Sequence, residues 1–182
     1  MLDMDPAEFR TFDPSAVQKV EQLTILGTDR FRPELLRPVR EAFIGKNTPP
    51  RHRRIFISRA RAARRRLLNE EEVWPLLEKA GFERVVMEDL TFQRQVELMA
   101  ETAVLFAPHG AGLTNMIFCP ESTHVVEIAD LSFPNPNFYA LASAMGHRYW
   151  LLPALGKGDA HPLERHMCIR ESAVRDVLTS LG

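Results

Sequence analysis

The chain has 182 residues and a formal net charge of −1, with 45% hydrophobic and 26% charged residues. This length suits one domain with a full core and is short for two, and the composition excludes a disordered chain. The near-zero net charge gives no reason to expect nucleic acid as a partner, although eight arginines crowd between residues 51 and 66.

The cysteine content and the start of the chain bear on its compartment. Cys119 and Cys168 are too few for a disulfide framework, so a reducing environment is expected. The first residues lack the basic and apolar regions of a signal peptide, and no apolar run reaches the length of a membrane span. We therefore expect a cytoplasmic protein, either free or peripheral to a membrane.

The N-terminal quarter shows a weak helical pattern. Four apolar residues between positions 35 and 43 have helical spacing, but Pro33 and Pro38 are expected to interrupt a helix there. We therefore interpret residues 1–48 as a linker or the remnant of an upstream domain, and residues 49–182 as one Rossmann-like domain.

After Pro50, short apolar runs alternate with amphipathic segments. Strands are predicted at residues 55–58, 84–87, 104–107, 125–128 and 149–152. Helices are predicted at residues 73–80, 92–103, 137–145 and 174–181, where apolar residues recur every three or four positions. Pro75 predicts that the first of these helices starts near Val73 or is kinked. The alternation predicts a doubly wound α/β fold, with a mostly parallel sheet and helices on both faces.

The third predicted strand leads directly into a glycine loop, Pro-His-Gly-Ala-Gly-Leu-Thr-Asn at 108–115. Ligands of open α/β sheets bind at the carboxyl ends of the strands, where this loop is expected. Gly110 and Gly112 permit positive φ angles and close backbone approach, and amides at the start of a following helix suit a diphosphate. Asn115 replaces the third glycine of the dinucleotide motif G-x-G-x-x-G, so the match is incomplete. A tight turn without a ligand is the alternative.

Other side chains around this edge favour a ligand. His109 adds a hydrogen-bond donor beside the turn, and Glu127 at the end of the next strand is suited to accept hydrogen bonds from ribose hydroxyls. Arg59 follows the first strand and offers a planar fork of donors to phosphate, with Arg66 as a second candidate. The remaining arginines are expected to be solvated or paired with the glutamates at 70–72.

Taken together, these motifs resemble glycosyltransferase family 61, which includes plant xylan arabinosyl- and xylosyltransferases, animal O-linked N-acetylglucosaminyltransferases and bacterial capsular polysaccharide enzymes. The resemblance covers roughly residues 33–152, and only Arg94 departs from it, at a position that is commonly acidic. It is carried by Ile57-Ser58-Arg59, Arg66-Leu67-Leu68-Asn69-Glu70, Gly81-Phe82, Gln95, the loop at 108–115, Phe118 and Val126-Glu127-Ile128.

The resemblance implies a GT-B architecture, in which two Rossmann-like domains face a cleft and the C-terminal one holds most of the nucleotide-sugar donor. This chain would be that C-terminal domain, with an N-terminal acceptor-binding domain as its partner and a glycan or other hydroxyl compound as acceptor. The implied reaction is sugar transfer with inversion at the anomeric carbon, in polysaccharide biosynthesis of the capsule type. We expect the isolated chain to be poorly active.

The residues assigned to nucleotide-sugar binding are Arg59, Arg66, His109, Gly110, Ala111, Gly112, Asn115 and Glu127. Arg59 and the loop amides are candidates for stabilising the departing diphosphate. His109 could share that task, orient the sugar or act in catalysis, and the sequence leaves the catalytic base unidentified.

Neither a metal nor a cofactor is expected. Asp3 and Asp5 have the D-x-D spacing of metal-bound nucleotide-sugar motifs, but a chain terminus is a poor place for a rigid site. His161, His166 and Cys168 have no established zinc-binding spacing. The nucleotide sugar is therefore the expected small-molecule ligand.

Two other functions remain open from the sequence. The glycine loop and Glu127 would also serve an NAD(P)-dependent oxidoreductase, although Asn115 and the position of the loop after the third strand argue against one. A non-catalytic nucleotide-binding module is the other alternative, because a fold alone does not establish turnover.

Overall fold

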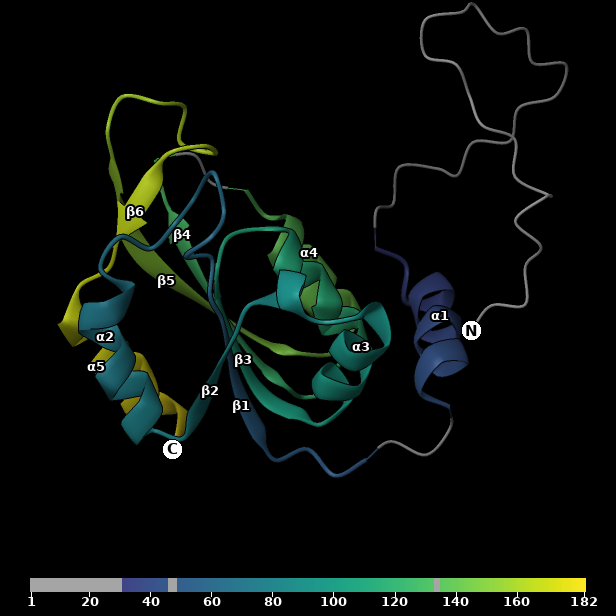
Figure 1. Ribbon diagram of the computed structural model, residues 1–182. Helices are drawn as coiled ribbons and strands as arrows, with labels where there is room; N and C mark the ends of the chain where they lie inside the picture. The colour runs from purple at the N-terminus through teal and green to yellow at the C-terminus, as the bar shows by residue number, and fades with distance from the viewer. Residues whose placement is uncertain (1–30, 46–48, 133–134) are drawn as a thin grey trace, which may run out of the picture.

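The structure is a computed structural model that describes residues 31–45, 49–132 and 135–182 (Figure 1). Its strands are β1 (Arg53–Ile57), β2 (Phe82–Val85), β3 (Thr102–Pro108), β4 (His124–Asp130), β5 (Arg148–Lys157) and β6 (His166–Cys168). Its α-helices are α1 (Pro33–Ile44), α2 (Glu70–Lys79), α3 (Phe92–Ala100), α4 (Asn137–Ala144) and α5 (Glu171–Leu181). Two 3₁₀ helices, η2 (Met87–Asp89) and η3 (Ala111–Phe118), complete the described elements.

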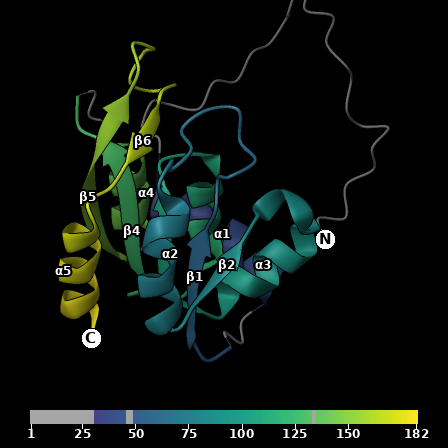
Figure 2. The same cartoon turned by 60° about the vertical axis from the view of Figure 1, so that its left-hand side comes forward.

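The strands form one sheet in the order β2-β1-β3-β4-β5-β6. Strands β1 to β5 are parallel, and β6 runs antiparallel to the end of β5 (Figure 2). The parallel part has the order 2-1-3-4-5, one of the two common doubly wound arrangements, whose direction reverses between β1 and β3. The predicted mostly parallel sheet is therefore confirmed, and β6 is an addition that the sequence did not predict.

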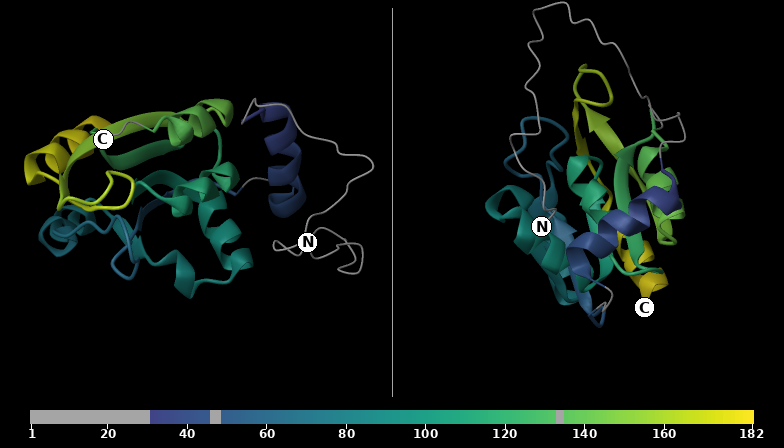
Figure 3. Two further views of the ribbon diagram at one scale, coloured as in Figure 1. Left: turned by 90° about the horizontal axis from the view of Figure 1, so that it is seen from above. Right: turned by 90° about the vertical axis from the view of Figure 1, so that its right-hand side faces the viewer.

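Helices cover both faces of the sheet, as Figures 1 and 3 show. On one face, α3, α4 and η3 pack over a core that includes Leu105 of β3, and α1 lies outermost against α3 and η3. On the other face, α2 and α5 pack over a core that includes Phe106. Both side chains are fully buried, since adjacent residues of a strand covered on both faces point into opposite cores.

Helix α1 corrects the expectation that Pro33 and Pro38 interrupt a helix. Pro33 is the first residue of the helix, where its missing N–H has no intrahelical partner to lose, and the helix continues through Pro38. Phe43 contacts the rings of Phe92 and Phe118 edge-on, with centroids 5.3 and 5.7 Å apart. The helix therefore forms despite Pro38, with Leu36, Phe43 and Ile44 partly buried against the core. The linker interpretation of residues 1–48 stays a prediction.

Two other helix boundaries differ from the expected ones. Helix α2 begins at Glu70, before the expected start at Val73, and contains Pro75 in its interior. Helix α3 ends at Ala100, before the end expected at residue 103. Strand β3 accordingly begins at Thr102, before the start expected at residue 104. Among the described residues, no helix combines the length and hydrophobicity needed to cross a membrane.

Candidate functional site

The carboxyl ends of β1, β3 and β4 meet at one edge of the sheet. Strand β1 is followed by Ser58 and Arg59, β3 is followed by His109 and Gly110, and β4 ends at Asp130. Because β1 and β3 are neighbours where the strand order reverses, Arg59 and the loop from His109 flank the crevice in which doubly wound sheets bind ligands.

Gly110 lies directly against the side chain of Arg59. A Cβ atom at Gly110 would overlap the Nη1 and Cζ atoms of the Arg59 guanidinium, so only glycine allows this approach. Its φ of 164° is extended, and Gly112 is also outside the left-handed region, so the expected positive φ angles are wrong. At Gly112, a Cβ would lie 3.3 Å from the Cγ2 atom of Ile57. Protein side chains therefore lie close to both glycines, while the expected close approach of a diphosphate to this backbone stays a prediction.

Arg59 has unused hydrogen-bonding capacity beside the loop. Its Nη2 donates to the carbonyl of Arg64 over 3.1 Å, whereas its buried Nε has no partner in the described part of the chain. Burial lowers the pKa of the Arg59 guanidinium, as does the charge of Arg65, and the charge of Glu88 opposes both. An anionic acceptor placed beside the guanidinium would offset the repulsion between the two cations.

Arg65, which the sequence did not single out, turns toward the site. Its Nε donates to the carbonyl of His109 over 3.1 Å and its Nη1 to the carbonyl of Leu163 over 2.5 Å. The backbone of Arg65 has a φ of 55°, which is uncommon for a residue with a side chain. The side chain of Arg66, the arginine that the sequence proposed, is exposed, and its backbone N–H donates to Nδ1 of His166.

His109, Glu127 and Tyr149 form one hydrogen-bonded unit. Nδ1 of His109 contacts Oε1 of Glu127, and the Tyr149 hydroxyl donates to Oε2 of the same carboxylate over 2.5 Å. The His109 ring also meets Phe138 edge-on at 5.1 Å between ring centroids. Within residues 31–45, 49–132 and 135–182, Nε2 of His109 has no hydrogen-bond partner. Glu127 therefore fixes the imidazole through Nδ1, while Nε2 is available to a ligand.

Glu127 is enclosed, with 1% of its side chain exposed against 12% for His109. Burial raises the pKa of Tyr149, and so do its hydrogen bond to Glu127 and the charge of that carboxylate. Tyr149 therefore stays a donor over the whole physiological range. A ligand would meet His109 or Tyr149 before it met Glu127.

The remaining predicted residues lie around the same loop. Ala111 is exposed at the start of η3. The Asn115 amide donates to Oε1 of Gln95 over 3.2 Å and to the carbonyl of Gly112 over 3.3 Å. Gln95 in turn donates to the carbonyl of Met87 over 2.9 Å, so Asn115 braces the loop against α3 and η2.

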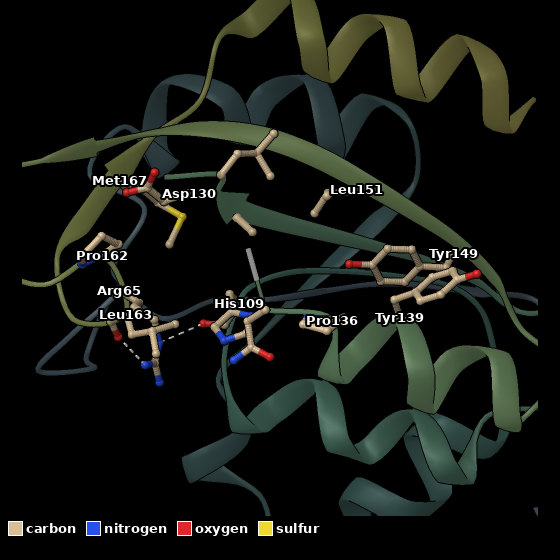
Figure 4. Close-up of a pocket in the computed structure, with 13 residues that line it drawn as sticks. Arg65, His109, Asp130, Pro136, Tyr139, Tyr149, Leu151, Pro162, Leu163 and Met167 are labelled. Carbon is tan, nitrogen blue, oxygen red and sulfur yellow. Dashed lines mark hydrogen bonds between the residues drawn. The ribbon is translucent and has the colours of Figure 1, made fainter. Parts of the chain in front are cut away.

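A cavity of about 260 Å³ opens beside His109 (Figure 4). It is lined by Arg65, His109, Ala129, Asp130, Leu131, Asn135, Pro136, Tyr139, Tyr149, Leu151, Pro162, Leu163 and Met167. Pro162 and Leu163 come from the segment between β5 and β6. Arg165 fastens this segment to the end of β4, because its Nε donates to Oδ2 of Asp130 over 2.5 Å.

The described residues contain no group of three or more His, Cys, Asp or Glu side chains arranged to hold a metal ion. His166 and Cys168 belong to β6, where Nδ1 of His166 accepts the Arg66 amide. Asp3 and Asp5 lie outside the described residues.

The doubly wound sheet, with polar loops gathered where its strand order reverses, places the chain among the Rossmann-like α/β proteins. The sequence model of the Glycosyltransferase 61 family matches residues 8–126. The chain belongs to this family, which confirms the resemblance inferred from its motifs.

Several curated proteins are similar to this chain over part of their length. The beta-1,2-xylosyltransferase XAX1 of Oryza sativa subsp. japonica is 34% identical over 132 residues, which is 69% of this chain and 23% of that protein. The EGF domain-specific O-linked N-acetylglucosamine transferase of Drosophila melanogaster is 35% identical over 105 residues, 56% of this chain and 20% of that protein. The alpha-1,3-arabinosyltransferase XAT3 of Oryza sativa subsp. japonica is 30% identical over 118 residues. The chain spans about a fifth of the length of these relatives.

Proposed function

We propose that this chain holds the nucleotide-sugar donor of a glycosyltransferase, with the donor diphosphate between Arg59 and the loop that starts at His109. The observation that carries the proposal is the Arg59 guanidinium, which lies against Gly110 with its buried Nε unpaired. A phosphate oxygen beside this half-buried guanidinium would accept a charge-assisted hydrogen bond, which contributes about 1.5–3 kcal/mol. Arg65, anchored on the carbonyl of His109, adds a second positive charge for the diphosphate.

In this proposal His109 is the base that activates the acceptor hydroxyl. The hydroxyl oxygen forms a bond to the anomeric carbon, the bond from that carbon to the diphosphate oxygen breaks, and the diphosphate leaves with the electron pair. The hydroxyl proton passes to Nε2 of His109, the nitrogen that has no partner in the described residues. Attack opposite the departing diphosphate inverts the configuration at carbon.

Glu127 receives a positioning role in place of the ribose contact expected from its position in the sequence. With its carboxylate enclosed and in contact with Nδ1 of His109, it favours the tautomer that carries the proton on Nδ1. That tautomer leaves the lone pair of Nε2 for the acceptor. The arrangement follows the logic of other enzymes in which a carboxylate orients a catalytic histidine.

The acceptor and the rest of the enzyme also belong to this proposal. The relatives are named for transfer of xylose, arabinose or N-acetylglucosamine, and we propose a glycan or glycan-bearing acceptor here as well. We further propose a GT-B arrangement, in which an N-terminal domain binds the acceptor over the edge that carries His109. An oxidoreductase is less well supported, because the Glu127 carboxylate that would bind an NAD ribose is enclosed.

Calorimetric titration of the full 182-residue chain with UDP, GDP, CDP and NADH tests the donor site. We expect one nucleoside diphosphate to bind, and Arg59→Ala to weaken it by about 1.5–3 kcal/mol through loss of a charge-assisted hydrogen bond. Arg61→Ala is the matched control, because Arg61 is an exposed arginine that pairs with Asp89. Absence of binding by every diphosphate at millimolar concentration would refute the proposal, and saturation by NADH alone would favour the oxidoreductase.

A further inference from the structure

The cavity beside His109 is bordered by large apolar side chains that remain exposed. Leu131, Tyr139 and Leu151 line it with 45%, 57% and 46% of their surface exposed. Isolated exposed apolar residues are ordinary, but a group of them around a concave site marks a surface that a ligand covers. The cavity therefore has the character of a binding site for an apolar group.

The polar side chains in the cavity are few, and most are already engaged within the protein. Asp130 accepts hydrogen bonds from Arg165 and from the Ser132 hydroxyl, the latter over 2.8 Å. Two of the Arg65 donors already form hydrogen bonds with the carbonyls of His109 and Leu163. A sugar ring has hydroxyls around its whole edge, and it would lose more hydrogen bonds to water than these walls replace. A flat ring with apolar faces suits the cavity better.

The cavity is continuous with the charged part of the site. Arg65 and His109 line it, and the backbone of His109 leads directly to Gly110 and the Arg59 guanidinium. At the other end, the rings of Tyr139 and Tyr149 meet edge-on, with centroids 5.6 Å apart and planes inclined by 73°. Figure 4 shows these two rings on one side of the cavity and Arg65 on the opposite side, with His109 between them. A ligand with a charged end and an aromatic end fits this polarity.

We propose that the cavity takes the nucleobase of a nucleoside diphosphate, with the base against the tyrosine wall and the diphosphate at Arg65 and Arg59. This inference rests on the proposed function, because it assumes that the diphosphate lies at the glycine loop. Tyr139 is the residue of the wall that we expect to stack on the base. It projects from α4, and its exposed ring offers the stacking surface that every base accepts.

The test compares nucleoside diphosphates with inorganic pyrophosphate, which carries the charge and lacks the base, by calorimetry on the full chain. We expect the wild-type chain to bind at least one of UDP, CDP and GDP about tenfold or more tightly than pyrophosphate, as stacking of one base provides. Tyr139→Ala should remove most of this preference and leave pyrophosphate affinity unchanged. Tyr139→Phe keeps the ring and should keep the preference.

Leu155→Ala is the control for Tyr139→Ala, because it also removes an exposed apolar side chain, and it should leave the preference for nucleotides unchanged. Leu155 belongs to β5 like Leu151 and is 53% exposed, but it does not line the cavity. Equal affinity for pyrophosphate and nucleotides in the wild-type chain, or a preference unchanged in Tyr139→Ala, would overturn this inference and leave the diphosphate site intact. If neither nucleotides nor pyrophosphate bind, the proposed function itself fails.

Discussion

The hydroxyl of Tyr149 donates a hydrogen bond of 2.5 Å to Oε2 of Glu127, on the neighbouring strand. In the parallel register, Tyr149 lies beside Val125, so its ring reaches Glu127 diagonally on the same face of the sheet. The hydrogen bond supplies a donor to the Glu127 oxygen that does not contact His109. Tyr149 thus supports, from β5, a carboxylate that orients the proposed base at the end of β3.

Tyr149→Phe should lower the free energy of unfolding by about 1–3 kcal/mol. The substitution keeps the ring but leaves Oε2 of a carboxylate that is 1% exposed without its donor. Urea unfolding of the two proteins at neutral pH measures the difference. Tyr139→Phe is the control, because that ring is 57% exposed and its hydroxyl has no hydrogen bond in the described part of the chain. Equal losses in the two variants would contradict the role assigned to Tyr149.

Gly110→Ala should weaken nucleoside diphosphate binding about as much as Arg59→Ala does. The new Cβ would occupy the space of the Arg59 guanidinium and displace it, so both substitutions remove the same contact. The double variant should therefore bind no more weakly than either single variant, which a double-mutant cycle by calorimetry checks.

Gly112→Ala is the comparison for this cycle. Its Cβ would have the Cγ2 atom of Ile57 as its nearest neighbour at 3.3 Å, and this side chain can shift slightly. We expect a smaller loss of affinity there. Additive losses for Gly110→Ala and Arg59→Ala would show that the glycine acts on binding independently of the arginine.

Stability should fall as the pH drops below about 6.5, partly because of His147. Its Nε2 lies 2.9 Å from the carbonyl of Met116, and its buried Nδ1 has no partner among the described residues. Burial lowers the pKa of His147 below its ordinary value of 6.5, as does the charge of Arg40, while the Met116 carbonyl opposes the shift. The unfolded chain therefore takes up the proton first, so stability present at neutral pH is lost as the pH falls through the folded pKa.

His147→Gln keeps a donor for Met116 and removes the titrating group, so its free energy of unfolding should decline less between about pH 7.5 and 5.5. Some decline should remain, because burial and the charge of Arg148 also lower the pKa of His124. An unchanged slope in His147→Gln would remove this histidine from the acid response.

The fold was predictable where periodicity is strong. The apolar run of β3 and the helical spacing of apolar residues in α4 and α5 are local patterns, and each predicts both the type of element and its buried face. Strand β6 has three residues, too few for any period, and it exists because the end of β5 offers it unpaired backbone groups. Helix α1 was misjudged because its stability comes from packing against α3 and η3, which propensity does not reveal.

The site was predictable in its location but not in its contacts. A loop after β3 and an arginine after β1 must meet where parallel strands end together, which placed Arg59 near Gly110. Arg65 and Arg66 are equivalent neighbours in the sequence, and only the backbone turn at Arg65 selects the one that points inward. The pairing of Tyr149 with Glu127 depends on the register of β4 against β5, which the nearly continuous apolar runs of these two strands do not specify.

Arg65 also links parts of the site that are far apart in the sequence. Its side chain joins the carbonyls of His109 and Leu163, which lie 44 and 98 residues further along the chain. Contacts of such separation form only after long loops have closed, at an entropic cost that local contacts do not carry. The cavity wall therefore forms only when three separated parts of the chain have reached their native positions. We expect nucleotide binding to report completed folding more strictly than secondary-structure content does.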